Sequence, residues 1–526
     1  MTRRAVVIGA GHNGLVCAAY LARAGLRVTV VERREVLGGS AVTEEIWPGF
    51  KSSRAAYVLG LFRPQIVREL ELARHGLRLL PRQPSSFTPL PDGRSLTLGA
   101  NLADNVAEIS RFSRRDAETY PRYETFLERI AAAVEPMLDA PPPQWPPRDR
   151  QAWRALLAGA RAGFGLGRDL PRAARLLLGP ARELLDEWFD SEPLKATLAT
   201  DAVIGAFASP ASPGTGYVLF HHVMGSVTGH RGVWAYVQGG MGQLSTAIAA
   251  AAQGAGALVR SAAPVAQIVV RQGRAAGVVL ESGEELRAEV VASCADPAVT
   301  FGRLVPDGVL PREFLRALGQ IDYRSPVFKM NLALDRLPQF QVRDVKAPPP
   351  LTGTIHVGSE TTEAIVTAFR EADQGEVSQR PVVEMTIPSV LDPTLAPEGK
   401  YVASIFAQYA PAKAMSDPGW PRRRDLARDR ILALVEEVAP GFRDSILHLE
   451  VLAPPDLERI FALTGGNIFH GAMTPDRLAS MRPVPNWSNY RTPLSGLYLC
   501  GSGAHPGGGV IGACGKNAAA AILSDR

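Results

Sequence analysis

The stretch Ala5-Val6-Val7-Ile8-Gly9-Ala10-Gly11-His12-Asn13-Gly14 decides the fold of this chain. Its first four residues predict a short buried strand, and three glycines in the spacing Gly-x-Gly-x-x-Gly follow that strand directly. A helical pattern then covers residues 15–24, Gly25 ends it, and residues 27–31 form a second strand-like run. This order of strand, turn, helix and strand predicts a Rossmann-type nucleotide-binding unit.

The three glycines and one acidic residue of this unit each have a physical role. Gly9 permits the tight turn, Gly11 lets the backbone approach a pyrophosphate, and Gly14 lets the helix pack closely on the strand. Glu32 follows the second strand, 23 residues after Gly9, where a carboxylate accepts hydrogen bonds from the ribose hydroxyl groups of an adenosine. The sequence therefore predicts that Gly9, Gly11, Gly14 and Glu32 bind a dinucleotide.

A second glycine pair follows the acidic residue. The chain continues from Glu32 as Arg33-Arg34-Glu35-Val36-Leu37-Gly38-Gly39-Ser40. In this it resembles the FAD-binding amine-oxidase and phytoene-desaturase superfamily, whose members place paired glycines just after the ribose-binding acid. The resemblance implies that the dinucleotide is FAD, and that Arg33, Gly38, Gly39 and Ser40 belong to its binding site.

A second segment with this resemblance lies in the middle of the chain. Residues 236–244 read Tyr-Val-Gln-Gly-Gly-Met-Gly-Gln-Leu, an alanine-rich helical stretch follows to residue 252, and short strand-like runs alternate with turns over residues 258–291. This order is similar to the second FAD-domain segment of the desaturase-like proteins. The resemblance implies that the backbone near Val265 contacts the adenine.

A third segment lies near the C-terminus, where residues 496–512 read Gly-Leu-Tyr-Leu-Cys-Gly-Ser-Gly-Ala-His-Pro-Gly-Gly-Gly-Val-Ile-Gly. A buried strand again runs into glycines, and an alanine-rich helix is expected to begin near Val510 and to extend through residue 520. The segment resembles the closing FAD motif of phytoene desaturases. The resemblance implies cofactor contacts from Gly501, Ser502, Gly509, Val510 and Ile511.

The three segments together are similar to the phytoene desaturase-like FAD-dependent oxidoreductases, and most of all to the subgroup of pyridine nucleotide-disulfide oxidoreductase domain-containing protein 2. The resemblance implies an α/β fold in which a Rossmann-type FAD-binding domain is interleaved with an α+β substrate domain. The predicted segments are residues 1–69, 231–300 and 461–526 for the FAD-binding domain, and residues 70–230 and 301–460 for the substrate domain.

The cysteines and histidines show no redox or metal-binding spacing. The four cysteines, at positions 17, 294, 500 and 514, form neither a Cys-x-x-Cys pair nor a zinc-ligand pattern, which excludes disulfide reduction and favours a reducing compartment. The nine histidines show no ligand spacing, and the adjacent His221 and His222 are expected to point apart on a strand. We therefore expect no metal site.

Charge and hydropathy argue against two further classes of protein. The 526 residues include 57 basic and 52 acidic side chains, and the resulting formal net charge of +5 is too weak for a protein that wraps nucleic acid. No run of 18 or more residues is uninterruptedly apolar, and the first strand begins too early to leave room for a signal peptide. The sequence therefore predicts a cytoplasmic protein that binds no nucleic acid.

Residues 148–182 form a basic, amphipathic segment. They contain eight arginines but only two acidic residues, Asp149 and Asp169, and apolar side chains such as Trp153 and Phe164 alternate with the arginines. Such a segment suits peripheral association with an anionic membrane or with a partner groove. A solvated helical face that covers the core is the alternative interpretation.

The resemblance implies an FAD-dependent oxidoreductase of the desaturase or dehydrogenase type, which acts on C–H or C=C bonds of an apolar isoprenoid, polyene or lipid-like substrate. Desaturation needs a base for the second proton, and His505 and His470 are the candidates because they lie in or near flavin-proximal motifs. His12 and Asn13 fill variable positions of the first motif and have no predicted role. Two alternatives keep all the nucleotide motifs: a redox-neutral, flavin-dependent cis/trans isomerase and a non-catalytic scaffold protein stabilised by FAD.

Overall fold

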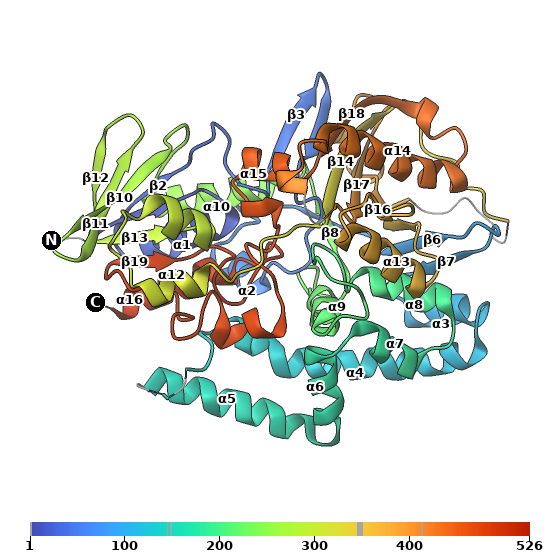
Figure 1. Cartoon of the computed structure of the whole chain (residues 1–526), viewed down its shortest axis with the longest axis horizontal. Helices are drawn as coiled ribbons and strands as arrows, with labels where there is room; N and C mark the ends of the chain where they lie inside the picture. Colours follow the sequence, from blue (N-terminus) through green and yellow to red (C-terminus); the bar gives the residue numbers. More distant parts are fainter. Residues whose placement is uncertain (1–2, 145, 148–149, 344–350, 412–413, 526) are drawn as a thin grey trace.

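The computed structural model describes residues 3–144, 146–147, 150–343, 351–411 and 414–525. Its first layer is a five-stranded parallel sheet in the order β19-β13-β1-β2-β9 (Figure 1). The strands are β1 (Arg4–Ile8), β2 (Arg27–Val31), β9 (Leu258–Arg260), β13 (Val290–Ser293) and β19 (Leu497–Leu499). The sheet thus brings the N-terminal, middle and C-terminal glycine-containing segments into one layer.

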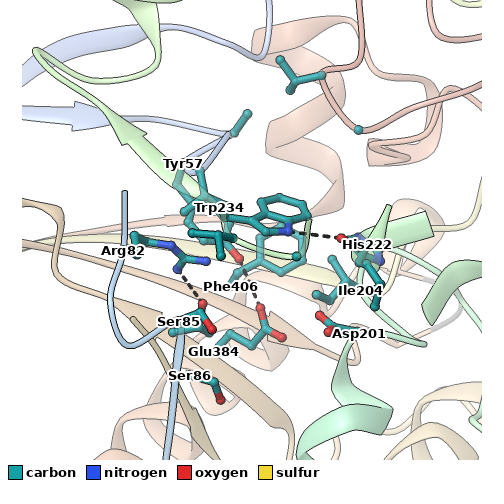
Figure 2. Close-up of a pocket in the computed structure, with 18 of the residues that line it drawn as sticks. Tyr57, Arg82, Ser85, Ser86, Asp201, Ile204, His222, Trp234, Glu384 and Phe406 are labelled. Carbon is teal, nitrogen blue, oxygen red and sulfur yellow. Dashed lines mark hydrogen bonds between the residues drawn. The ribbon is translucent and has the colours of Figure 1, made fainter. Parts of the chain in front are cut away.

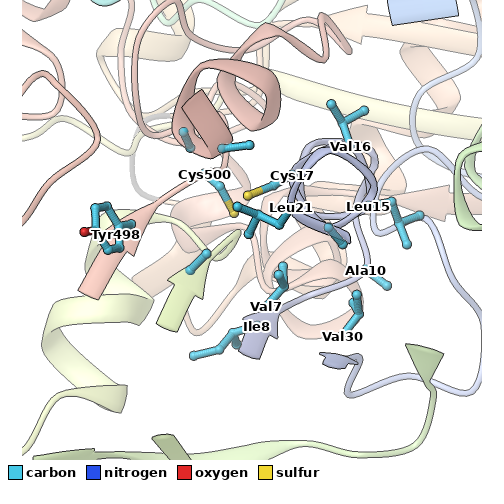
Figure 3. Close-up of a cluster of buried hydrophobic side chains, with 14 of the residues drawn as sticks. Val7, Ile8, Ala10, Leu15, Val16, Cys17, Leu21, Val30, Tyr498 and Cys500 are labelled. Carbon is cyan, nitrogen blue, oxygen red and sulfur yellow. The ribbon is translucent and has the colours of Figure 1, made fainter. Parts of the chain in front are cut away.

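Three helices pack against this sheet: α1 (His12–Arg23), α10 (Gly242–Gly254) and α16 (Ala513–Ser524). Leu15, Val16 and Leu21 of α1 are fully buried, and Figure 3 shows this helix beside the strand that carries Val7 and Ile8. A Cβ atom at Gly515 would lie 2.0 Å from the Asn13 carbonyl oxygen, so α1 and α16 pack closely only because this residue is glycine. Aliphatic strands and alanine-rich helices therefore form one continuous core.

A three-stranded antiparallel sheet covers part of the parallel sheet in the order β10-β11-β12. Its strands are β10 (Val265–Arg271), β11 (Arg274–Leu280) and β12 (Glu285–Arg287). The turn between β10 and β11 uses Gln272 and Gly273, both at positive φ, as the Gln-Gly sequence favours. The helices α11 (Pro297–Val299) and α12 (Arg312–Leu318) follow β13 in the sequence.

The second large layer is a seven-stranded mixed sheet in the order β18-β14-β17-β16-β15-β6-β7. Its strands are β6 (Ser86–Pro89), β7 (Ser95–Leu98), β14 (Val327–Leu334), β15 (Thr354–Val357), β16 (Val382–Thr386), β17 (Tyr401–Gln408) and β18 (Ile446–Leu452). Its central strands are buried along their whole length, which explains their nearly continuous apolar sequences. The helices α13 (Thr362–Asp373), α14 (Trp420–Val438) and α15 (Pro454–Phe461) accompany this sheet.

A helical layer lies below both sheets in Figure 1, and α5 forms its outer edge. Its helices are α3 (Leu102–Ser110), α4 (Arg114–Leu138), α5 (Arg150–Leu166), α6 (Leu170–Leu178), α7 (Ala181–Trp188), α8 (Glu192–Thr200) and α9 (Thr215–Val223). Shorter elements connect the layers: β3 (Thr43–Trp47), β4 (Phe50–Ser53), α2 (Pro64–Glu69), β5 (Leu79–Pro81) and β8 (Ala235–Val237). The pairing of β5 with β8 joins two segments that are far apart in the sequence.

Two expectations about local structure were wrong. His221 and His222 lie in α9 rather than on a strand, because a short apolar run is compatible with a buried helix as well as with a strand. The C-terminal helix begins at Ala513 rather than near Val510, since Val510 and Gly512 both have positive φ and cannot continue a right-handed helix. The division into a discontinuous FAD-binding domain and a substrate domain stays a prediction.

Candidate active site

The helix α1 begins at His12, directly after Gly11 in the turn that follows β1. No side chain of a described residue caps this helix start, so the N–H groups of its first turn are available to an anion. A Cβ atom at Gly14 would lie 2.2 Å from the Gly9 carbonyl oxygen, whereas one at Gly11 would meet only Cys294 Sγ, at 3.5 Å. Packing therefore requires glycine at position 14, while Gly11 borders open space where a pyrophosphate is expected.

Glu32 follows β2 beside the same turn. Its side chain is buried, and Oε2 accepts the N–H of Ala10 at 2.8 Å while Oε1 accepts the N–H of Arg34 at 3.0 Å. The Ala263 N–H donates to the Glu32 carbonyl oxygen at 2.8 Å, and β10 begins two residues later with Val265. The structure thus places Glu32 between the glycine turn and the segment that leads to Val265.

The second glycine pair lies against the first glycine turn. The Gly38 N–H donates to the Ala10 carbonyl oxygen at 2.9 Å, and a Cβ atom at Gly39 would lie 3.4 Å from the Gly11 Cα. Ser40, the next residue, faces the large cavity described below. These predicted binding residues are therefore brought together in space around one turn.

The C-terminal motif meets the N-terminal motif from the other side. A Cβ atom at Gly501 would lie 2.2 Å from the Cys294 carbonyl oxygen, so glycine lets the two strand ends cross. The Asn13 side-chain amide donates to Ser502 Oγ at 3.1 Å, and Asn13 Oδ1 accepts the Gly515 N–H at 3.4 Å. Asn13, which had no predicted role, therefore connects the first and the last motif.

Further along the C-terminal motif, Gly509 and Val510 line the cavity. Gly509 has a φ of +109°, and a Cβ atom there would lie 3.0 Å from His221 Nε2. Val510 also has positive φ, whereas the buried Ile511 uses its carbonyl oxygen to accept the Arg63 N–H at 3.1 Å. Gly509 and Val510 thus line the cavity, and the buried Ile511 anchors the loop in the core.

Four histidines of the described chain line the cavity, and two of them, His12 and His470, lie beside these motifs. The His12 Nε2 and the His470 Nδ1 are buried and make no hydrogen bond within the described part of the chain. Burial, assisted by the nearby His470, lowers the pKa of His12 to about 3, and burial also lowers the pKa of His470. Both imidazoles are therefore neutral at neutral pH, and each has a free ring nitrogen.

His505 and Arg33 are placed differently. The His505 Nε2 lies 3.0 Å from the Met137 carbonyl oxygen, burial lowers its pKa to about 4, and His505 is not among the described residues that line the cavity. The Arg33 guanidinium donates to the Ile460 carbonyl oxygen. The base role of His505 and the cofactor role of Arg33 stay predictions.

The cavity has a volume of about 380 Å³ and extends from the two glycine motifs to the seven-stranded sheet. At the motif end it is lined by Ser40, Ser502, Gly509, Val510, His12 and His470. Its middle has an aromatic wall of Tyr57, Trp234 and Phe406, and Figure 2 shows Arg82 beside these rings and Glu384 and Asp201 below them. The cavity is therefore apolar along part of its length and strongly polar at one end.

Glu384 lies at the centre of the polar end. Its Oε2 accepts a hydrogen bond from the Tyr57 hydroxyl at 3.3 Å, while Oε1 lies 3.8 Å from His356 Nδ1 (Figure 2 shows the Tyr57 contact). Burial and the neighbouring Asp201 raise the pKa of Glu384 to about 8, and burial also raises the pKa of Asp201. Glu384 is thus mostly protonated at neutral pH.

Lys329 is a buried amine on the wall of the same cavity. Its Nζ donates to Asn331 Oδ1 at 2.8 Å and to Ser404 Oγ, and lies 5.2 Å from the centre of the Tyr57 ring. Burial lowers the pKa of Lys329 to about 7. An amine with this pKa is a chemically competent base near neutral pH.

Sequence reasoning missed these polar residues of the cavity. A signal was present, because Lys329 interrupts the apolar run Val-Phe-Lys-Met-Asn-Leu-Ala-Leu and Glu384 interrupts Val-Val-Glu-Met-Thr. Charged residues are rarely buried in a central strand unless they have a partner or a function. Asp201 and Arg82 lie in loops, and no comparable pattern marks them in the sequence.

The residues around the glycine motifs fit FAD. A site that can bind an anion lies beside the Glu32 carboxylate. It consists of the uncapped N–H groups at the start of α1, the open space at Gly11 and the His12 Nε2, which has no partner among the described residues. Gly9, Gly11, Glu32 and Gly39 would hold the adenosine diphosphate part of the cofactor. Ser40, Ser502 and Val510 line the cavity where the flavin part would meet a substrate.

Comparison with known proteins shows the same family along the chain. The family model described as flavin containing amine oxidoreductase matches residues 14–523. The pyridine nucleotide-disulfide oxidoreductase domain-containing protein 2 of Rattus norvegicus is 52% identical, over 99% of this chain and 93% of the relative. A component of the limonene dehydrogenase of Castellaniella defragrans is 29% identical, over 99% and 94% of the two chains, and the lycopene-forming phytoene desaturase of Pseudescherichia vulneris is 25% identical, over 99% of each.

A solved structure of an oxidoreductase from Methanosarcina mazei has a TM-score of 0.60 at 18% identity and covers 99% of this chain and 100% of its own. The predicted fold class, the resemblance to desaturase-like FAD proteins and the FAD cofactor are confirmed by these matches. Within the described residues, no group of three or more His, Cys, Asp or Glu side chains is arranged to hold a metal ion.

Proposed function

Because the chain belongs to the flavin containing amine oxidoreductase family and is an FAD-dependent oxidoreductase, we propose that it dehydrogenates a C–H bond of a substrate with an apolar body. The observation that carries this proposal is the cavity itself. Residues of the FAD motifs, such as Ser502 and Val510, share one continuous cavity with the aromatic wall of Tyr57, Trp234 and Phe406. A substrate held along that wall would present a carbon atom to the cofactor.

The chain's own residues would bind, orient and deprotonate the substrate. Bound FAD supplies the hydride acceptor. The aromatic wall that Figure 2 shows would exclude water and limit how the substrate can lie, which would contribute to the rate through orientation. The His470 Nδ1 and the Lys329 amine line the cavity and are the groups that could take the second proton, because the first is unpaired and neutral and the second has a pKa of about 7.

The names of two relatives support the choice of substrate class. One relative is named as part of a limonene dehydrogenase and another as a phytoene desaturase, and both names refer to isoprenoid hydrocarbons. Isoprenoid and acyl compounds are therefore the substrates that we propose to test first. The isomerase and scaffold alternatives predict different outcomes of that test.

Two measurements distinguish the three functions. Mass spectrometry of apolar molecules that co-purify with the protein identifies candidate substrates. Anaerobic incubation of each candidate with the FAD-loaded protein should then give reduced flavin and a product with two hydrogen atoms fewer. An isomerised product without flavin reduction would support the isomerase instead, and the absence of both would support the scaffold.

We also propose that the outer helices associate with an anionic membrane. On α5, Trp153, Leu157 and Phe164 are 56%, 54% and 87% exposed. Arg154 and Arg161 of α5 are exposed beside them, and they form no ion pair with any described residue. This combination of exposed apolar and basic side chains supports binding at a lipid headgroup region.

The proposed association is with the surface of the membrane and does not involve a helix that crosses it. Residues 148–149 of the predicted basic segment lie outside the described residues. Among the helices of the described chain, none combines the length and the apolar character needed to cross a bilayer. The proposed cytoplasmic location stays a prediction.

A further inference from the structure

Arg82 is a buried guanidinium at the polar end of the cavity. It follows β5, its side chain is only 4% exposed, and its backbone N–H donates to the Trp234 carbonyl oxygen at 3.1 Å. The guanidinium donates a hydrogen bond of 2.7 Å from Nη1 to Thr354 Oγ1, and it lies 5.5 Å from the centre of the Tyr236 ring. These contacts fix the direction of the side chain into the cavity, where Figure 2 shows it beside Tyr57 and Glu384.

No anion within the described residues pairs with this guanidinium. No carboxylate oxygen of a described residue lies within 4.0 Å of its nitrogen atoms, and Nε is buried without a hydrogen-bond partner. Arg231, the other arginine that lines the cavity, differs because it pairs with Glu128 and Glu135, both at 3.0 Å. Arg82 is therefore a buried charge that lacks the ion pair expected of such a group.

The ionisable groups near Arg82 have pKa values that burial shifts toward their neutral forms. Burial raises the pKa of Glu384 to about 8 and that of Asp201 above its usual value, although the Arg82 charge acts in the opposite direction on both, and burial lowers the pKa of Lys329 to about 7. A guanidinium stays charged in a protein interior. Arg82 is thus a permanent charge at this end of the cavity, and no carboxylate of a described residue pairs with it.

The polar atoms around Arg82 that have no partner among the described residues are mainly hydrogen-bond donors. They include the Arg82 Nε and the buried Ser86 Oγ on β6. Protonated Glu384 adds an O–H group that can donate to a ligand. Both Ser86 and Glu384 line the cavity with Arg82, so the donors surround one space.

We propose that Arg82, Ser86 and Glu384 form a subsite for a carboxylate group of the substrate, at the end of the cavity opposite the FAD motifs. Arg82 would balance the negative charge, and Ser86 and protonated Glu384 would donate hydrogen bonds to the carboxylate oxygens. This proposal rests on the proposed function in one respect, because it assumes that the substrate binds in the same cavity. The substrate is then an acid with an apolar body, anchored at the polar end so that its chain extends along the aromatic wall toward the cofactor.

Three probes with the same chain and different head groups test the subsite on the FAD-loaded protein: decanoate, 1-decanol and decylamine. Isothermal titration calorimetry at neutral pH should show that decanoate binds at least about tenfold more tightly than decanol, because a charged hydrogen-bonded partner contributes more than a neutral one. Decylamine should bind more weakly than decanoate. Equal affinities for decanoate and decanol would overturn the proposal. Tighter binding of decylamine than of decanoate would also overturn it, because it would show that Asp201 and Glu384 bind a cation there.

Variants assign the preference to one side chain. Arg82→Met should reduce decanoate affinity to that of decanol, and Arg82→Lys should restore part of the preference because the charge remains. Arg231→Met is the matched control, since it removes a guanidinium that already has partners. Unchanged selectivity in Arg82→Met, with normal FAD content and circular dichroism, would contradict the assignment.

The comparison of head groups in the unaltered protein decides the question even if Arg82→Met fails to fold. The outcome is also separate from that of the proposed function. Selective decanoate binding without flavin reduction by any candidate would retain the subsite and reject the dehydrogenase. Flavin reduction by an isoprenoid hydrocarbon without any preference for decanoate would do the reverse.

Discussion

Asn13 and Ser502 are 489 positions apart in the sequence, yet the Asn13 side-chain amide donates a hydrogen bond of 3.1 Å to the Ser502 hydroxyl. This contact joins the start of α1 to the loop after β19. It forms beside the cavity, which Ser502 lines. The glycine motifs at the two ends of the chain therefore come together only in the folded protein.

The first prediction contrasts two glycines of the same motif. Gly11→Val should fold, because a Cβ atom there meets only Cys294 Sγ at 3.5 Å, but it should lose FAD because the side chain enters the pyrophosphate space. Gly14→Val should instead destabilise the fold, since even a Cβ atom would lie 2.2 Å from the Gly9 carbonyl oxygen. Flavin content and thermal unfolding measure the two effects, and full FAD occupancy in Gly11→Val would refute the proposed site.

The second prediction separates the two candidate histidines. His470→Ala should lower the rate of flavin reduction at least about tenfold if its free Nδ1 takes the proton, with FAD still bound. His505→Ala should have a smaller effect, because its Nε2 is already engaged with Met137 away from the described cavity lining. Single-turnover reduction rates with the same substrate decide between them, and a larger loss in His505→Ala would restore His505 as the base.

The third prediction concerns the pH dependence of carboxylate binding. Below its pKa of about 8, Glu384 is protonated and donates to the ligand, whereas above that pH its negative charge repels a carboxylate. Decanoate affinity should therefore fall as the pH rises through 8. The groups that face Glu384 are Tyr57, Asp201, His356 and Arg82, and Lys329 lies over the Tyr57 ring.

Glu384→Gln provides the control for that pH dependence. Its amide donates a hydrogen bond at every pH, so the fall in decanoate affinity above pH 8 should largely disappear. A fall of the same size in Glu384→Gln would show that another group, such as Lys329, is responsible.

The fourth prediction tests the membrane surface. Flotation with vesicles that contain anionic lipid should recover the protein at low salt and less of it at high salt, because exposed charges are screened. Replacing Arg154, Arg161 and Arg168 by Glu should abolish recovery. The matched control makes the same change to Glu at Arg312, Arg316 and Arg422, and it should retain the recovery. These arginines are exposed on other helices and also lack ion pairs within the described chain. Equal loss in both triple variants would show that only net charge matters.

The strand, glycine turn and helix of the candidate nucleotide site could be predicted from the sequence, because backbone geometry imposes local rules on them. The glycines of the first motif and Glu32 occur at fixed spacings from a strand and a helix. The role of Asn13 could not be predicted, since it depends on contacts with Ser502 and Gly515 at the far end of the chain.

The polar end of the cavity was beyond sequence reasoning for a similar reason. Arg82, Asp201 and Glu384 come from two loops and a strand that are separated by more than a hundred residues, and only the fold brings them together. The sequence predicted an apolar substrate, because motifs of the FAD domain carry no information about the opposite wall. The carboxylate subsite that we propose adds a polar anchor, which changes the chemical class of substrate that we expect.

Anaerobic flavin reduction tests the central claim most directly. The FAD-loaded protein is mixed without oxygen with the isoprenoid acid farnesoate and, separately, with the hydrocarbon farnesene, and the oxidised-flavin absorbance is followed while products are identified by mass spectrometry. We expect bleaching with a product that has lost two hydrogen atoms, faster with farnesoate than with farnesene. No bleaching with these compounds or with any co-purifying apolar molecule would contradict the claim that the protein is a dehydrogenase of such substrates.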